Sequence, residues 1–333
     1  AVDRIRLAAA GRVRAVLRDP AGAVAAAMLV GDRAGIDEPT AEAFRETGLA
    51  HLLAISGLHM GLVAGTVYAS VRLALSLVPA VVLRWPVKKW AAGCALLVAA
   101  LYLFLAGAPV PTQRAFLMTG LVLTAVLLDR EAISLHLVAW AAAVVLLASP
   151  EALIGPSFQL SFAAVTALIA LWEAVAKWRR RHPGRARGWV RRIAGYVAGV
   201  ASTSLVASLV TAPVAAHHFQ QVPALGAIAN LVAVPATAFL TMPAGVLALL
   251  AMPIGWEAWP LRAMGWGIDL TLWVADFASD APLTAVGVTA LGTGPLVMLG
   301  FGGLWLAMWR TGLRWFGGGL VGFGVLTGGR EQA

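Results

Sequence analysis

The sequence predicts an all-α, polytopic transmembrane helical bundle with about nine to ten spans, including a broken or re-entrant helix, plus N-terminal interfacial helices. Hydrophobic residues fill 60% of the 333 positions and charged residues only 12%, whereas roughly 25% of the residues of a soluble domain are charged. Several apolar windows exceed the ~20 residues that a helix needs to cross the hydrocarbon core. The period-2 alternation of membrane strands is almost absent, so we expect the spans to be helices.

The first 48 residues open with a basic, amphipathic segment, DRIRLAAAGRVRAVLRD, in which arginines and apolar residues alternate at roughly helical spacing. This pattern suits a helix lying on a membrane surface, and equally a solvated helix packed on a neighbouring domain. We expect residues 1–48 to be interfacial, residues 49–328 to form the transmembrane domain and residues 329–333 to be a tail. The start at Ala1, without a methionine or a signal peptide, leads us to expect a fragment of a longer protein.

Apolar windows bounded by charge, proline or glycine predict the individual crossings. The nine clearest are residues 50–82, 87–107, 112–129, 132–149, 156–177, 194–217, 223–252, 260–279 and 284–309, with a glycine-rich tenth at 311–327. The window 223–252 is longer than one straight span needs and contains Pro235 and Pro243, which remove backbone donors. It therefore predicts the broken or re-entrant helix, facing a water-filled cavity or kinked only by packing.

Basic residues gather in alternate connections, which sets the orientation by the positive-inside rule. The basic side carries Arg84, Lys88, Lys89, Arg130, Lys177, Arg179, Arg180, Arg181, Arg185, Arg187, Arg191, Arg192, Arg262, Arg310 and Arg314. The opposite connections carry only Arg114. We therefore expect the basic side to be cytoplasmic, and His51 with the first 48 residues to lie outside.

The first crossing presents two different faces on a helical wheel. The glycine stripe consists of Gly57, Gly61 and Gly65, a spacing that lets another helix backbone approach closely. The second stripe consists of Ser56, His59, Thr66 and Ser70. Polar groups in a membrane need partners, so we expect this second stripe to meet polar groups of another helix or to line water.

Two later crossings also carry polar residues. Ser204, Ser208, Thr211 and His218 recur at i, i+4, i+7 and i+14, which favours a second wet stripe, unless the hydroxyls bond their own backbone. The window 260–279 places Asp269 and Asp276 on one face beside a stripe of Trp259, Trp266 and Trp273. It is a crossing whose carboxylates face the protein interior, or an interfacial helix.

The sequence lacks the patterns of several chemistries. There is no G-x-x-x-x-G-K-[ST] loop, no H-E-x-x-H and only one cysteine, Cys94, so we expect no nucleotide-binding loop, no bound metal and no cofactor. Ser56 and His59, three residues apart on one helix, are not expected to reach the geometry of a nucleophile and base. Adjacent His217 and His218 point about 100° apart, which disfavours joint metal ligation. We expect no catalytic residue.

Five motifs resemble the successive signatures of the ComEC competence proteins, in the order found in that family. They are GDRAGI at Gly31–Ile36, GLAHLLAISGLHMGLVAG at Gly48–Gly65, PTQRAFLM at Pro111–Met118, GPSFQLSF at Gly155–Phe162 and HHFQQVPALGAIANLVAVP at His217–Pro235. The resemblance implies a multi-pass channel of the bacterial inner (cytoplasmic) membrane that passes one strand of DNA during natural transformation. Full-length relatives add an OB-like domain and a nuclease-like metallo-β-lactamase domain, which this chain lacks, so no enzyme activity is expected of it.

The resemblance also implies the partners: single-stranded DNA, an extracytoplasmic DNA receptor and a cytoplasmic ATPase or strand-binding proteins. Membrane lipid and a second copy of the chain complete the candidates. The alternative function is a polytopic transporter or exporter of another solute, and the third is a membrane enzyme or scaffold. The basic block from Lys177 to Arg192 either catches an emerging strand or is a topology determinant attracted to anionic lipid.

Single-stranded DNA needs an electropositive entry, polar walls and aromatic faces for stacking. The candidate pore-lining residues are His51, Ser56, His59, Thr66, Arg114, Phe158, Gln159, Ser161, Ser204, Ser208, Thr211, His218, Phe219, Gln220 and Asn230. Each phenylalanine is alternatively a residue of lipid or core packing. Arg114 alternatively pairs with a helix C-terminus or a lipid phosphate, and we expect the two aspartates of 260–279 to pair with arginine or to lie outside the path.

Overall fold

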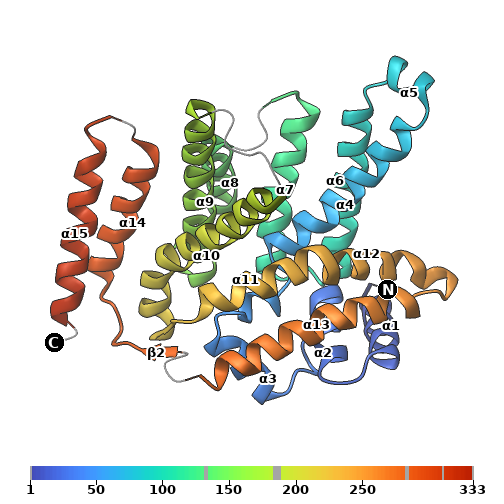
Figure 1. Ribbon diagram of the computed structural model, residues 1–333, viewed down its shortest axis with the longest axis horizontal. Helices are drawn as coiled ribbons and strands as arrows, with labels where there is room; N and C mark the ends of the chain where they lie inside the picture. Colours follow the sequence, from blue (N-terminus) through green and yellow to red (C-terminus); the bar gives the residue numbers. More distant parts are fainter. Residues whose placement is uncertain (1, 131–133, 183–188, 282–284, 310, 332–333) are drawn as a thin grey trace. The chain divides into compact units, whose positions relative to one another are not determined.

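The computed structural model of the chain describes residues 2–130, 134–182, 189–281, 285–309 and 311–331. The first seven helices are α1 (Val2–Val16), α2 (Ala21–Val30), α3 (Glu38–Glu46), α4 (Gly57–Ser76), α5 (Pro79–Arg84), α6 (Val87–Leu105) and α7 (Val110–Leu127). The others are α8 (Leu135–Ala148), α9 (Pro156–Arg181), α10 (Trp189–Phe219), α11 (Gly226–Ala236), α12 (Met242–Ala251), α13 (Ala258–Ser279), α14 (Thr293–Met308) and α15 (Arg314–Glu331). Short elements complete the described residues: η1 (Ala50–Leu52), η2 (Pro150–Ile154), β1 (Gln221–Pro223), the π segment η3 (Thr237–Thr241), η4 (Met252–Ile254) and β2 (Ala285–Gly287). The predicted all-helical class is confirmed (Figure 1).

Six of the described helical segments are long and apolar enough to cross a membrane, and the expected count of nine to ten is not confirmed. The six are α4, α6, α7, α9, Arg192–Phe219 of α10 and the joined segment Gly226–Ile254. The apolar helices α8 and α14 have only 14 and 16 residues. α13 and α15 are not among the six, because charged residues on α13 and many glycines on α15 lower their hydropathy.

The chain forms two compact units, the first from residues 1–132 and 232–282, the second from residues 133–231 and 283–333. At the centre of the first unit lies α2, a run of alanines with larger residues at its end, in which all ten residues are buried. Its neighbours include α1, α12 and α13. α2 lies within the segment 1–48 that is expected to be interfacial, and its small side chains let other helices of this unit surround it.

α1 is tied to this unit by its arginines. Arg12 Nε donates to Glu257 Oε1 over 2.6 Å, and another guanidinium nitrogen of Arg12 donates to the Met252 carbonyl over 2.8 Å. Arg14 pairs with Asp32 over 2.9 Å. The amphipathic pattern thus predicts the helix correctly, while these two basic side chains bind partners within the protein rather than lipid.

The window 223–252, which is expected to be a broken or re-entrant helix, forms one helical segment, Gly226–Ile254, with a π segment between α11 and α12. Pro235 and Pro243 have no backbone N–H and cannot donate to the carbonyl one turn earlier, so each removes one bond of the regular helix ladder near Thr237–Thr241. α13 packs closely against this segment. A Cβ on Gly267 would overlap the Thr241 Oγ1, which shows how close the approach is.

The second unit contains α8, α9, α10, α14, α15 and a small antiparallel sheet in which β1 pairs with β2. α14 and α15 lie side by side (Figure 1). A Cβ on Gly302 would lie 2.8 Å from the Gly317 carbonyl oxygen, and one on Gly317 would lie 2.7 Å from that of Gly302. Gly302 and Gly317, the latter in the glycine-rich window 311–327, therefore bring two helix backbones together.

Candidate functional site

The start of α4 is shaped by a hydrogen-bonded pair, Ser56 and His59. The Ser56 backbone N–H donates to His59 Nδ1 over 3.3 Å, and Ser56 Oγ lies 2.9 Å from the same nitrogen. Ser56 precedes the helix in an extended conformation, and the pair closes the helix in the manner of a capping box. The two side chains meet as a helix cap because Ser56 lies just before the helix and not within it.

His59 is completely buried. Because Nδ1 accepts from Ser56, a neutral ring carries its proton on Nε2. This Nε2 is buried and has no hydrogen-bond partner among the described residues. Within the described part of the chain, no third residue bonds to the pair as the orienting group of a catalytic triad would. Its geometry is that of a helix cap that presents one free donor.

The motif PTQRAFLM starts α7 and gives its three polar residues different environments. Thr112 Oγ1 donates to the Ile55 carbonyl, just before α4, over 3.4 Å. Gln113 Nε2 donates over 2.7 Å to the carbonyl of Ala108, a residue with positive φ in the preceding turn. Arg114 is 7% exposed, and its Nε is buried without a partner. The motif therefore holds the starts of α4 and α7 together and leaves an arginine unused.

His51 lies in η1, just before α4. Its Nδ1–H donates to the Gly48 carbonyl over 2.9 Å. Desolvation lowers the pKa of His51 below its usual value, and the hydrogen bond to the Gly48 carbonyl opposes this shift.

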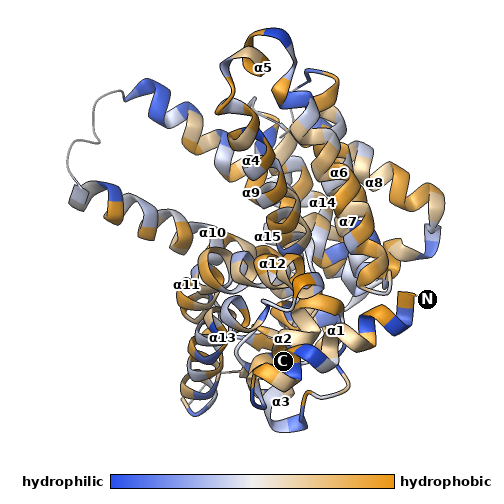
Figure 2. Cartoon of the chain, turned by 90° about the vertical axis from the view of Figure 1, so that its right-hand side faces the viewer, coloured by the Kyte–Doolittle hydropathy of each residue, from blue (hydrophilic) through white to orange (hydrophobic). Residues whose placement is uncertain are grey.

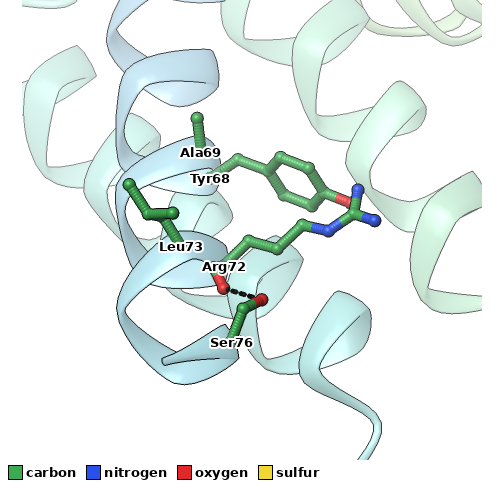
Figure 3. Close-up of a pocket in the computed structure, with 5 residues that line it drawn as sticks. All are labelled: Tyr68, Ala69, Arg72, Leu73 and Ser76. Atoms are coloured by element: carbon green, nitrogen blue, oxygen red, sulfur yellow. Dashed lines mark hydrogen bonds between the residues drawn. The ribbon is translucent and has the colours of Figure 1, made fainter. Parts of the chain in front are cut away.

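The rest of the second stripe of α4 becomes more exposed along the helix, from half-buried Thr66 to exposed Ser70. Near the end of α4, Tyr68 and Arg72 reach in the same direction over a shallow hollow, where Ser76 Oγ donates to the Arg72 carbonyl over 2.6 Å (Figure 3). α4 thus offers polar side chains over most of its length.

The glycine stripe does not pack against a described helix. Gly57, Gly61 and Gly65 are exposed, and a Cβ on any of them would meet nothing within 4 Å. The expected close contact is therefore absent within the described chain. Close glycine contacts of this unit occur instead at Gly245, where a Cβ would lie 2.6 Å from Leu29, and at Gly267.

In the second unit, the motifs GPSFQLSF and HHFQQVPALGAIANLVAVP meet through side chains. His218 Nε2–H donates to Gln159 Oε1 over 3.0 Å, and Gln159 Nε2 donates to the Leu153 carbonyl over 3.0 Å. His217 Nδ1–H donates to the Leu291 carbonyl over 2.5 Å. The two histidines therefore have separate partners, as their divergent directions on α10 predict.

The three candidate phenylalanines occupy different environments. Phe158 and Phe162 are buried, with ring centroids 4.3 Å apart and ring planes tilted by 34°, so the two rings contact each other. Phe219, at the end of α10, is 55% exposed. Of the three, only Phe219 presents an aromatic surface to a ligand without rearrangement.

The sequence leaves two explanations for the polar residues of α10, a wet stripe and hydroxyls bonded to their own backbone. Thr211 Oγ1 donates to the Ala207 carbonyl over 2.8 Å, as a hydroxyl bonded to its own backbone. Ser204 and Ser208 are half-buried, as are Ser161 of α9 and Asn230 of α11. The Asn230 Oδ1 is buried without a partner among the described residues, and exposed Gln220 has positive φ where the chain leaves α10 for β1.

α13 has one buried face and one exposed face. Asp269, Asp276 and the stripe Trp259, Trp266 and Trp273 are exposed, and Arg262 lies over the Trp259 ring at 5.6 Å. This distribution favours the interfacial alternative for residues 260–279. Thr237 and Thr241 are not among the residues expected from the sequence, and their hydroxyls are buried without partners among the described residues. Their spacing of four residues beside Pro235 is the signal in the sequence that points to them.

The basic block continues α9 to its C-terminal end. Hydrophilic residues gather there (Figure 2), with Arg179, Arg180 and Arg181 in the last turn, where cations suit the helix dipole. Arg185, Arg187 and Arg310 lie outside the described residues, and so does the end of the expected tail. Over the described part of the chain, no cluster of three His, Cys, Asp or Glu residues could hold a metal ion.

Comparison with known proteins identifies the family. Residues 28–313 match the family model described as "Competence protein". ComE operon protein 3 of Bacillus subtilis is 31% identical over 229 residues, which are 68% of this chain and 26% of that protein. Competence protein ComA of Neisseria gonorrhoeae is 32% identical over 265 residues, 78% of this chain and 35% of that protein.

Recombination protein 2 of Haemophilus influenzae is 26% identical over 279 residues, 82% of this chain and 34% of that protein. The chain thus spans about a quarter to a third of the length of these relatives. No solved structure matches the chain. The matched residues, 28–313, include all five motifs. The match confirms the resemblance. The chain belongs to the competence protein family.

Proposed function

We propose that this chain forms the membrane core of a DNA-uptake channel in the bacterial inner membrane, through which a single strand of DNA enters the cell during natural transformation. The observation that carries the proposal is the family match, which runs from residue 28 to residue 313 and spans all six candidate membrane segments. A DNA strand is a polyanion with stackable bases, so its path needs cations, hydrogen-bonding groups and aromatic faces.

Each compact unit offers groups of this kind. The first unit has Arg114 and the polar residues of α4, including Thr66 and Ser70. The second has exposed Phe219 next to the hydrogen-bonded pair of His218 and Gln159. These residues support the proposal because several polar groups lie on membrane-length helices, where polar side chains are costly and commonly functional.

Delivery of the strand and the force that moves it come from partner proteins. A DNA receptor outside the membrane delivers the strand, and an ATPase or strand-binding protein in the cytoplasm draws it through. The exposed basic turn at the end of α9 gives the strand, or anionic lipid, an electrostatic contact on the cytoplasmic side. We assign no chemical step to this chain.

The test uses the full-length gene in a naturally transformable bacterium. Arg114→Gln and Thr66→Leu are introduced separately, with Leu97→Ile on the exposed face of α6 as a control. At matched protein levels, we expect the two polar changes to lower entry of labelled DNA into the cytoplasm by about tenfold, and the control to leave it unchanged. Normal uptake in both polar variants would remove these residues from the path.

A transporter of another solute is the second candidate, and Thr237 and Thr241 favour it. Both hydroxyls are buried without partners among the described residues, in a π segment inside a candidate span, and π segments are frequent at functional sites. Thr237→Val with Thr241→Val distinguishes the two functions. If the double variant takes up DNA normally while flux of a small polar solute through the reconstituted protein falls, the transporter is the better description.

A further inference from the structure

Arg114 combines burial with the absence of a counter-ion. It is 7% exposed, and no hydrogen bond or ion pair joins it to any described residue. A buried charge is costly unless it is paired. Carboxylates of the same unit pair with other bases, among them Asp32 with Arg14, Glu257 with Arg12 and Asp129 with Lys89.

The position of Arg114 in its helix adds to this cost. It is the fifth residue of α7, so it lies near the positive end of the helix dipole, where a cation is disfavoured and an anion is favoured. Helical side chains lean toward the N-terminus of their helix. The guanidinium therefore extends toward the start of α7, where backbone N–H groups already favour negative charge.

A second unused donor lies at the neighbouring helix start. His59 is the third residue of α4, is fully buried and has a free Nε2–H. The hydrogen bond from Thr112 to the Ile55 carbonyl brings the starts of the two helices together, because Thr112 is two residues before Arg114 and Ile55 is four before His59. The same end of the unit thus holds two buried donors, from two helix N-termini, and neither has an acceptor.

We propose that Arg114 and the Nε2–H of His59 bind a phosphate oxyanion between the starts of α4 and α7. Arginine donates two parallel hydrogen bonds to a phosphate group, and His59 supplies a third from a fixed direction, since its Nδ1 is held by Ser56. A phosphodiester of the entering strand and an anionic lipid headgroup both present this chemistry. The DNA source rests on the proposed function, whereas the lipid source does not.

The experiment measures phosphate-group binding to the purified chain in maltoside micelles. A fluorescent oligothymidylate is titrated by anisotropy, and retention of added phosphatidylglycerol is measured by native mass spectrometry. The variants are Arg114→Gln, Arg114→Lys and His59→Glu; the last keeps the acceptor that caps α4, as glutamate does in a capping box, but reverses the sign at the site. Arg45→Gln is the matched control, because Arg45 is ion-paired with Glu38 and Glu42.

We expect Arg114→Gln and His59→Glu to weaken oligothymidylate binding about tenfold or more, Arg114→Lys to retain most of it and Arg45→Gln to change nothing. The salt dependence of Arg114→Gln should fall by about 0.7 per lost phosphate contact. If the variants lose only phosphatidylglycerol retention, or lose it in a chain that binds no oligothymidylate, the site is upheld and assigned to lipid. Either outcome argues against a part for this site in the DNA path. The site is overturned if every variant with an unchanged melting temperature still binds both oligothymidylate and phosphatidylglycerol. Oligothymidylate binding that is equal in all variants leaves the proposed function standing.

Discussion

At the scale of single residues, the polar members of the motifs separate into those that shape helix ends and those left without a partner. Ser56, Thr112 and Gln113 each hold a helix start or the turn before it. Arg114 and the Nε2 of His59 do not. The sequence could predict that these residues matter, but not this division, because a cap depends on the backbone conformation of one residue.

Tyr102 provides a test of buried hydrogen bonding around α2. Its hydroxyl donates to the Met28 carbonyl over 3.0 Å, one of the last four carbonyls of α2, which have no partner inside that helix. Tyr102→Phe should therefore destabilise the protein by about 1 kcal/mol. Tyr68→Phe, on the exposed part of α4, is the control. Equal melting temperatures for both variants and the unchanged protein would contradict the structure at this contact.

Gly31 tests the backbone at the end of α2. It has φ of +72°, and a Cβ there would lie 2.8 Å from the Ala106 carbonyl oxygen. Gly31→Ala should cost about 1 to 3 kcal/mol, seen as a lower melting temperature. Gly61→Ala, in open space on α4, should be neutral or stabilising by up to about 1 kcal/mol. Loss of stability at Gly61 would instead show that the glycine stripe has a helix partner outside the described chain.

At the scale of elements, hydropathy predicted the existence of the long helices and missed how several of them are used. The window 260–279 contains enough apolar residues for a crossing, but α13 buries one face against its own unit and exposes tryptophans and carboxylates on the other. The sequence places the apolar α2 within the predicted interfacial segment 1–48, because its ten residues are too few for a crossing. Nothing in the sequence shows which helices surround it.

The contact between α13 and the π segment gives an element-scale prediction. Gly267→Ala adds a Cβ that would collide with Thr241 Oγ1 and lie 3.2 Å from the Thr241 backbone nitrogen. Such overpacking should destabilise the protein by about 1 to 3 kcal/mol. Gly300→Ala on α14, where a Cβ meets nothing within 4 Å, is the control. A Gly267 variant that melts with the control would show that the two segments are not in contact.

The ion pair between the start of α6 and the end of α7 gives a pH-dependent prediction. Lys89 Nζ lies 2.7 Å from Asp129 Oδ2, and this hydrogen bond, with the charges of Lys89 and Lys88, lowers the pKa of Asp129. A lowered pKa in the folded state stabilises the protein above the ordinary aspartate pKa of about 3.9, and the effect is lost as pH falls through the lower value.

Asp129→Asn isolates that charge, because asparagine also tolerates the positive φ of 55° at this position. The variant should melt slightly below the unchanged protein at neutral pH, and the difference should shrink in 1 M salt. The difference should also begin to shrink as the pH falls below about 4 and disappear once the pH passes the lowered pKa of Asp129. A difference that persists at low pH would mean that the charge is not its cause.

At the scale of the whole molecule, the sequence predicts a helical membrane protein and its family correctly, through composition and five ordered motifs. It could not predict the division into two compact units, since each is assembled from two separate stretches of chain. Contacts such as the bond from His218 to Gln159 join residues 59 positions apart. No local pattern encodes such a pairing, which depends on how whole helices pack.

The central claim, that a single strand of DNA passes through the bundle formed by this chain, is tested most directly by photo-crosslinking during uptake. A photoreactive amino acid replaces Thr66 of α4, Ser204 of α10 or exposed Leu97 of α6 in the full-length protein of a transformable bacterium that is taking up labelled DNA. The account predicts protein–DNA crosslinks from positions 66 and 204 and none from position 97. Active uptake with no crosslink at 66 or 204, or with equal crosslinking at 97, would contradict it.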